Sequence, residues 1–176
     1  MLDRLIQELI VSDISFGELA QVDKDGLLIN SRILSYGAEY PVLVTDPKTG
    51  KPLERVVDLS KLSTKTMDVM CDDLGEFTYS TKDINIKFKF AKVSDNTLDL
   101  SISKLLSLLI TEINGSRKQS DIDHFIQYEF LVKDSKKFQN HINDITPEIL
   151  LEYEFEGEDG STFTSRFPIN RNFFWL

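Results

Sequence analysis

The fold is decided by residues 27–62, which read LLINSRILSYGAEYPVLVTDPKTGKPLERVVDLSKL. Apolar residues spread around the helical wheel over 26–36, which predicts a helix buried between layers or a helix with one side turned to a partner chain. Gly37 tolerates the positive φ at which many helices end. Alternating side chains predict strands near 40–45 and 53–59, joined by the turn Asp46-Pro47-Lys48-Thr49-Gly50. The stretch therefore predicts a helix followed by an antiparallel hairpin.

Further elements follow on both sides of this stretch. An amphipathic helix is expected at 2–11, packed on its own core or on a partner. Strands are expected at 77–80 and 84–90, and one turn of helix near 67–70. The strongest helical spacing covers 98–113, with Asn96 or Thr97 as its cap. Two more helices are predicted, one from Ser120 and one near 135–142.

The last hairpin has a register that can be argued from its side chains. A loop of Glu158, Asp159 and a left-handed Gly160 places Leu151 opposite Phe167 and Phe155 opposite Phe163. The order of helices, strands, helices and strands indicates the α+β class, with antiparallel hairpins packed against several helices. The length suits a single compact domain over 1–176, with one domain and an appended lobe as the alternative.

Composition excludes several classes of function. With 20 basic and 29 acidic residues the net charge is −9, which argues against non-specific nucleic-acid binding. The apolar run at the N-terminus contains acidic residues, unlike a signal peptide, and no apolar run is long enough to cross a membrane. Cys71 is the lone cysteine, so no intrachain disulfide or Cys-rich zinc site is expected, and the compartment is expected to be reducing.

No catalytic or metal-binding signature appears in the sequence. His124 and His141 lie in helical segments without the partners of a zinc motif, so we expect no metal and no cofactor. Paired carboxylates among Asp73, Glu152 and Glu154 leave one alternative, a small enzyme acting on cell-wall glycan. A strand-alternating acidic row is typical of a solvated face, so the main expectation is that the chain is not an enzyme.

Several motifs resemble the baseplate hub family of T-even-type contractile-tailed bacteriophages. They are the helix end Arg32 to Gly37, the strand start Glu39-Tyr40, the return Val57-Asp58-Leu59, and the closing residues Phe167 to Ile169 and Phe173 to Trp175. The whole of residues 27–62, together with these closing residues, covers about a quarter of the chain. The resemblance also implies a Cys-Pro-x-Cys knuckle at the hairpin turn, where this chain has Asp46 to Gly50 and no cysteine. A zinc site of that kind is therefore not expected.

The resemblance implies a structural protein of the tail baseplate, near its hub, that assembles with other tail proteins as part of a larger oligomer and has no catalytic activity. Its location would be the virion, and the host cytoplasm during assembly. A regulatory adaptor for a host protein remains a further alternative. The candidate interface residues lie on two helices and at the C-terminus: Leu27, Ile33, Tyr36, Leu105, Leu106, Leu109, Phe173, Phe174 and Trp175.

Overall fold

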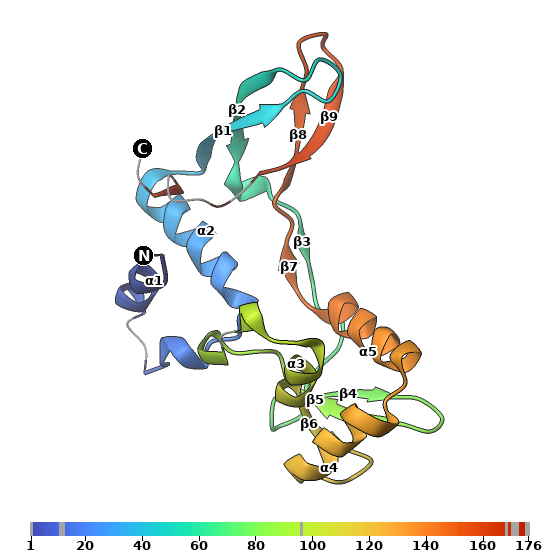
Figure 1. The fold of residues 1–176 in the computed structure, drawn as a ribbon. Coiled ribbons are helices and arrows are strands. Elements are labelled where there is room, and N and C mark those ends of the chain that lie inside the picture. The colour runs from blue at the N-terminus through green and yellow to red at the C-terminus, as the bar shows by residue number, and fades with distance from the viewer. Residues whose placement is uncertain (1, 11–12, 96, 168, 170–172, 175–176) are drawn as a thin grey trace. The chain divides into compact units, whose positions relative to one another are not determined.

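The structure is a computed structural model that describes residues 2–10, 13–95, 97–167, 169 and 173–174 (Figure 1). It confirms the α+β class, because helices and antiparallel strands follow one another largely in groups along the chain. Residue contacts divide the chain into two units. The first comprises Met1–Val11, Asp23–Lys65 and Glu148–Leu176, and the second comprises Ser12–Val22 and Thr66–Pro147. The expectation of a single domain stays a prediction.

In the first unit, a helix is followed directly by a two-stranded hairpin. Helix α2 (Asp23–Tyr36) ends where Gly37 adopts a φ of 89°, as predicted. Strands β1 (Glu39–Thr45) and β2 (Pro52–Asp58) then pair in register from Glu39 opposite Asp58 to Thr45 opposite Pro52. The predicted hairpin is therefore confirmed.

The other elements of this unit complete its core. They are α1 (Leu2–Leu9), the 3-10 turn η2 (Leu59–Lys61), the short pair β3 (Thr64–Lys65) with β7 (Glu148–Ile149), and the hairpin of β8 (Glu152–Glu156) with β9 (Thr162–Arg166). The register of this last hairpin is confirmed, with Phe155 opposite Phe163 and Gly160 at a φ of 78°. Ile6 of α1 is buried, so α1 packs on its own core through this residue. Only one face of α2 is buried, and Leu34 near its end is exposed.

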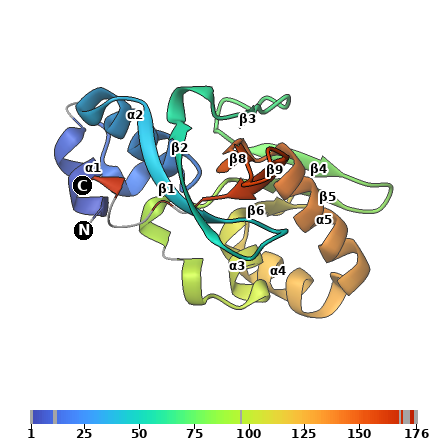
Figure 2. The same cartoon turned by 90° about the horizontal axis from the view of Figure 1, so that it is seen from above.

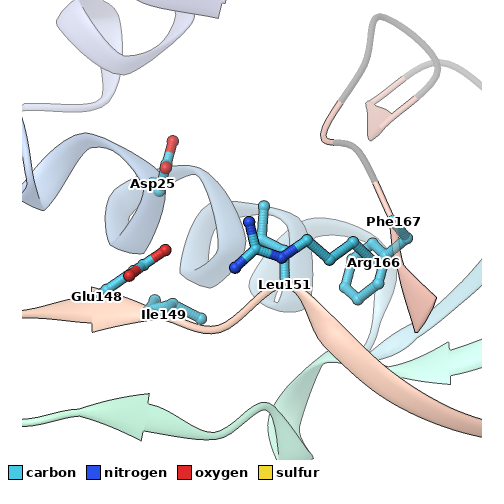
Figure 3. Close-up of a pocket in the computed structure, with 6 residues that line it drawn as sticks. All are labelled: Asp25, Glu148, Ile149, Leu151, Arg166 and Phe167. Atoms are coloured by element: carbon cyan, nitrogen blue, oxygen red, sulfur yellow. The ribbon is translucent and has the colours of Figure 1, made fainter. Parts of the chain in front are cut away.

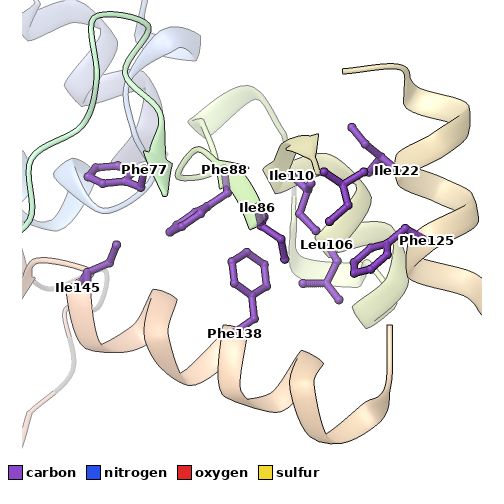
Figure 4. Close-up of a cluster of buried hydrophobic side chains, with 10 residues drawn as sticks. Phe77, Ile86, Phe88, Leu106, Ile110, Ile122, Phe125, Phe138 and Ile145 are labelled. Atoms are coloured by element: carbon purple, nitrogen blue, oxygen red, sulfur yellow. The ribbon is translucent and has the colours of Figure 1, made fainter. Parts of the chain in front are cut away.

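In the second unit, three helices gather around a three-stranded sheet (Figure 2). The sheet has the order β4 (Phe77–Ser80), β5 (Asn85–Phe88), β6 (Ile110–Ile113). The helices are α3 (Ile102–Leu109), α4 (Gln119–His124), which continues as the π-helix η5 (Phe125–Glu129), and α5 (Val132–Ile145). Short 3-10 turns lie at Phe16–Glu18 (η1), Val93–Asp95 (η3) and Thr97–Asp99 (η4). The buried side chains of the sheet and helices meet in one cluster that includes Phe88, Leu106 and Phe138 (Figure 4).

Two predicted helices of this unit exist with other bounds, and other local predictions are wrong. The helix predicted over 98–113 begins at Ile102, capped by Ser101 and not by Asn96 or Thr97, and it ends at Leu109. Residues 110–113 form β6 because Ile110 and Ile113 pair with β5, and this strand pairing overrides the helical spacing. The turn of helix expected near 67–70 is absent from this described stretch, and α5 is longer than the predicted 135–142.

No described helix is long and apolar enough to cross a membrane.

Candidate functional site

The tips of the two hairpins of the first unit are joined by ion pairs. Lys48 Nζ lies 2.8 Å from Asp159 Oδ2 and donates to Ser161 Oγ at 2.8 Å. Lys51 Nζ lies 3.1 Å from Glu158 Oε2. Residues more than a hundred positions apart in the chain thus meet, and the two hairpins lie side by side (Figure 1).

Below these exposed pairs, the buried carboxylate of Asp46 organises both loops. It accepts backbone N–H groups from Lys48 at 2.7 Å, Thr49 at 3.2 Å and Glu158 at 3.5 Å. The Lys48 N–H is the main reason that the pKa of Asp46 is held below its usual value, and the Thr49 and Glu158 N–H groups act in the same direction. Gly157 is enclosed here, because a Cβ on it would lie 3.2 Å from Asp46 Oδ2. One side chain therefore holds the turn of its own hairpin and the start of the other loop.

A third contact joins the strands behind the tips. Arg55 on β2 donates from Nε at 2.9 Å and from Nη2 at 2.7 Å to the backbone carbonyl of Glu156 on β8. A planar guanidinium that makes two bonds to one oxygen fixes direction as well as distance. The two hairpins are therefore held together at their tips and along their strands.

The joined hairpins carry an outer apolar face, which we define as Pro41, Leu43 and Val56. Pro41 lies directly opposite Val56, and Leu43 is the next residue of β1 on the same side. Leu43 is 69% exposed and Val56 is 55% exposed, whereas Tyr40, Val44 and Val57 on the other side are buried. Glu54, directly opposite Leu43, and Glu39 lie on the same side, so the three apolar residues form a small patch with an acidic border. The outward side of a hairpin is usually polar, so such a patch suits contact with another protein.

The motif Arg32 to Gly37 has a structural role at the end of α2. Arg32 is only 1% exposed, and its guanidinium lies 4.7 Å from the centre of the Tyr36 ring. Its Nη1 donates to the carbonyl of Gly37 at 3.4 Å, at the helix end where a cation is favoured. The motif therefore fixes the point at which the chain leaves the helix for the hairpin.

The structure places the nine predicted interface residues in different environments. In α2, Leu27 and Ile33 are half-buried and Tyr36 is exposed. Phe173 and Phe174 are buried, and the Phe173 ring lies 4.9 Å from that of Tyr40. Trp175 lies outside the described residues.

The three candidates on α3 belong to the second unit. Leu106 and Leu109 are buried in its core, and Leu105 is half-buried. All three line an apolar groove of about 120 Å³ with Ile102 and Ile142. A charged residue at Leu106 or Leu109 would therefore destabilise the fold of the second unit, so a loss of assembly would not by itself show an interface.

A larger pocket of about 340 Å³ lies in the first unit (Figure 3). Its lining comprises Asp25, Glu148, Ile149, Leu151, Arg166 and Phe167. Figure 3 shows the Arg166 side chain extending over Leu151 toward Glu148. Arg166 Nε also lies 2.7 Å from Glu152 Oε1, which occupies one of the carboxylates considered for glycan hydrolysis.

The next feature is the set of side chains that could bind a metal ion. In the described part of the chain, no group of three or more His, Cys, Asp and Glu side chains is placed to hold an ion. His124 Nδ1 lies 3.0 Å from Glu129 Oε1, and the His141 ring packs on the Tyr79 ring at 5.1 Å. The lone thiol of Cys71 is exposed.

Sequence reasoning did not single out Asp46 or Arg55. The motif Asp-Pro-x-Thr carries a signal for Asp46, since an aspartate at the start of a turn often accepts the N–H groups of the residues that follow. Nothing in the sequence links Arg55 to the carbonyl of a residue 101 positions away.

Comparison with known proteins identifies the family. No curated protein and no solved structure matches the chain. A family profile described as T4 bacteriophage base plate protein matches residues 1–155, which include the helix end, the joined hairpin β1–β2 and the whole of the second unit. The baseplate resemblance is thus confirmed over most of the sequence, and the chain belongs to the T4 bacteriophage base plate protein family.

Proposed function

We propose that this chain is a structural subunit of the hub of a contractile-tail baseplate and that it works by protein–protein assembly without catalysis. It would be made late, meet its partners in the host cytoplasm, and remain in the virion as part of a larger oligomer. Membership of the baseplate family supports a structural role in the tail. The outer apolar face of Pro41, Leu43 and Val56 is the main support for a function in protein–protein assembly.

The joined hairpins suit this face to assembly. A two-stranded hairpin is only marginally stable by itself in water. Here the contacts of Asp46, Lys48 and Arg55 tie β1–β2 to β8–β9, so the face is held in shape before a partner arrives. A surface that is ordered beforehand loses less conformational entropy on binding. Tyr36 remains a candidate for the same interface, because it is exposed at the end of the helix that leads into β1.

The test is incorporation of a Leu43→Glu variant into baseplates. A tagged chain would be supplied in trans to a phage that lacks its own copy, and purified baseplates would be assayed by quantitative mass spectrometry. We expect the variant to fold, because Leu43 is exposed. The amount of it in purified baseplates should be about tenfold or more below that of the wild type. The matched control is Thr45→Glu, an exposed polar position on the same side of β1.

The outcomes separate the parts of the proposal. Absence of the wild-type chain from purified baseplates would overturn the structural role. Normal incorporation of a folded Leu43→Glu variant would overturn the use of the outer apolar face. Cross-linking of the wild-type chain only to proteins outside the hub would overturn the hub position.

A further inference from the structure

A second exposed apolar cluster lies in the other unit, where the π-helix η5 meets α5. We define the α5 knob as Tyr128, Leu131 and Val132 together with Lys133 and Lys136. Tyr128 is 69% exposed, Leu131 is 67% exposed and Val132 is 86% exposed. Single exposed apolar residues are ordinary, but three such residues within five consecutive positions are unusual. The Tyr128 ring lies 5.0 Å from that of His124, whereas Leu131 and Val132 make up the rest of the exposed apolar part of the knob.

The chain breaks two local rules at this point. Helix α5 begins after Leu131, which gives no side-chain cap, although Ser, Thr, Asp and Asn are the residues preferred there. The helix before it ends as a π-helix, in which the N–H of Phe130 donates to the carbonyl of Phe125 at 2.8 Å. Such π-bulges are rare and often lie at functional sites. The π-turn has a packing role, because it places the Phe130 ring 4.8 Å from that of Phe125 at the core of the unit. The exposed, uncapped start of α5 has no such gain, which indicates a role outside the fold of the monomer.

Charged residues of both signs lie around the knob. Glu129 Oε1 lies 3.0 Å from His124 Nδ1, and Asp134 is paired with Lys137, so the charges left without such a partner are lysines. Lys133, Lys136 and Lys137 are exposed in the first two turns of α5, where the helix N-terminus already carries partial positive charge. Lys137 Nζ is paired with Asp134 at 3.1 Å, whereas Lys133 and Lys136 have no ion pair with any described residue. The whole chain has a net charge of −9, so this positive spot stands against an acidic background.

We infer that the α5 knob docks an acidic segment of another baseplate protein, with carboxylates opposite Lys133 and Lys136 and apolar side chains against Leu131 and Val132. The inference rests on the proposed function and adds a second contact surface, with the chemistry of its partner. Complementary charge favours such a partner, since the two free lysines and the helix N-terminus all attract carboxylates. Two free lysines are fewer than the basic clusters that bind nucleic acid or anionic lipid, which disfavours those polyanions as ligands.

The first experiment reverses the charge of the knob. A Lys133→Glu/Lys136→Glu variant would be supplied in trans beside the wild-type chain, with Lys82→Glu/Lys104→Glu as the matched control at exposed lysines of the same unit. We expect the amount of the knob variant in purified baseplates to be about tenfold or more below that of the wild type. The amount of the control variant should equal that of the wild type. A thermal melt of each purified variant confirms that it folds. If the reversed variant does not fold, Lys133→Gln/Lys136→Gln replaces it.

The second experiment identifies what covers the knob. A photo-cross-linking amino acid at Val132, with Thr78 as the control position, would be activated in assembled baseplates and the joined peptides sequenced. We expect Val132 to cross-link to a peptide of another baseplate protein that carries at least two Asp or Glu residues. A peptide from a second copy of this chain, a basic peptide, or no cross-link at Val132 would overturn the inference.

The failures of the two proposals differ. If the wild-type chain is present in baseplates and the knob variant is present equally, the knob inference fails and the hub proposal stands. If the wild-type chain is absent from baseplates, both fail. If the knob variant assembles normally but loses the binding of the wild type to phosphatidylglycerol vesicles, the knob is a lipid contact and the inference is wrong.

Discussion

At the scale of single residues, the buried charges of this protein are held by specific donors. Glu76 is buried in the second unit and accepts two bonds from Arg117, at 3.0 Å from Nη1 and 2.8 Å from Nη2. Arg117 Nε also lies 2.9 Å from Glu112. The Arg117 guanidinium is the main reason that the pKa of Glu76 lies below its usual value.

This pair leads to a prediction about stability and pH. A carboxylate with a lowered pKa stabilises the folded state above its unfolded pKa, and the contribution is lost as the pH falls through the folded pKa. We expect Glu76→Gln to lower the free energy of unfolding by about 1.5–3 kcal/mol at pH 7. The variant should also lose less stability than the wild type when the pH falls below the ordinary Glu value of 4.5.

Urea unfolding at pH 7 and under acidic conditions measures both effects. Glu54→Gln, at an exposed strand position, serves as the control. An unchanged pH dependence in Glu76→Gln would contradict the prediction.

Contacts of this kind lie beyond what the sequence predicts. Glu76 and Arg117 are 41 positions apart, and neither belongs to a motif. The outer apolar face shows the same limit, because Pro41, Leu43 and Val42 are all apolar and alternation alone does not say which side of β1 is covered. Asp46 is the exception, since the turn around it has a recognisable composition.

At the scale of elements, a prediction was right where several independent features of the sequence favoured the same structure. For the hairpin β8–β9, the alternation of aromatic and acidic residues, the charge pair Glu152–Arg166 and the glycine in the loop all favour one register, and the structure has that register. For 98–113, the apolar spacing fits a helix throughout. Only pairing with β5, a partner distant in sequence, makes residues 110–113 a strand. Local periodicity cannot report such a partner.

The loop glycine of β8–β9 gives a prediction at this scale. Gly160 has a φ of 78°, a conformation in which an L side chain is strained. Gly160→Ala should lower the free energy of unfolding by about 1–2 kcal/mol, while Gly160→Asn should cost less, because asparagine tolerates the left-handed region. Thermal melts of the two variants measure this difference. Equal stability of Gly160→Ala and the wild type would show that the loop adopts another conformation.

At the scale of the whole molecule, neither unit is a continuous piece of chain. The first consists of three segments and the second of two, so the backbone passes between them four times. Completing either unit therefore requires segments that are separated in sequence by the other. We propose on this basis that the chain behaves as a single domain in folding.

A core substitution tests this proposal. Phe138 is fully buried in the second unit, and its ring meets Phe88 at 5.1 Å. We expect Phe138→Ala to lower the free energy of unfolding by about 3–5 kcal/mol and to lower the temperature of one common transition in calorimetry. Phe155→Ala, a buried position of the first unit, should shift the same transition. Two transitions, of which each variant moves only one, would mean two independently folding domains.

The π-helix at Phe125–Glu129 has a consequence for changes in chain length. A π-turn holds one residue more than an α-turn, so it is the place where a helix absorbs a single-residue insertion. Deleting one residue between 125 and 129 would restore regular α-helical bonding. It would also turn every later residue of that helix by about 100° about its axis, because an α-helix has 3.6 residues per turn. Phe130 would leave its place against Phe125, where their rings lie 4.8 Å apart, and the start of α5 would point elsewhere. Family members one residue shorter here should therefore present a different surface at this corner, even where the surrounding sequence is the same.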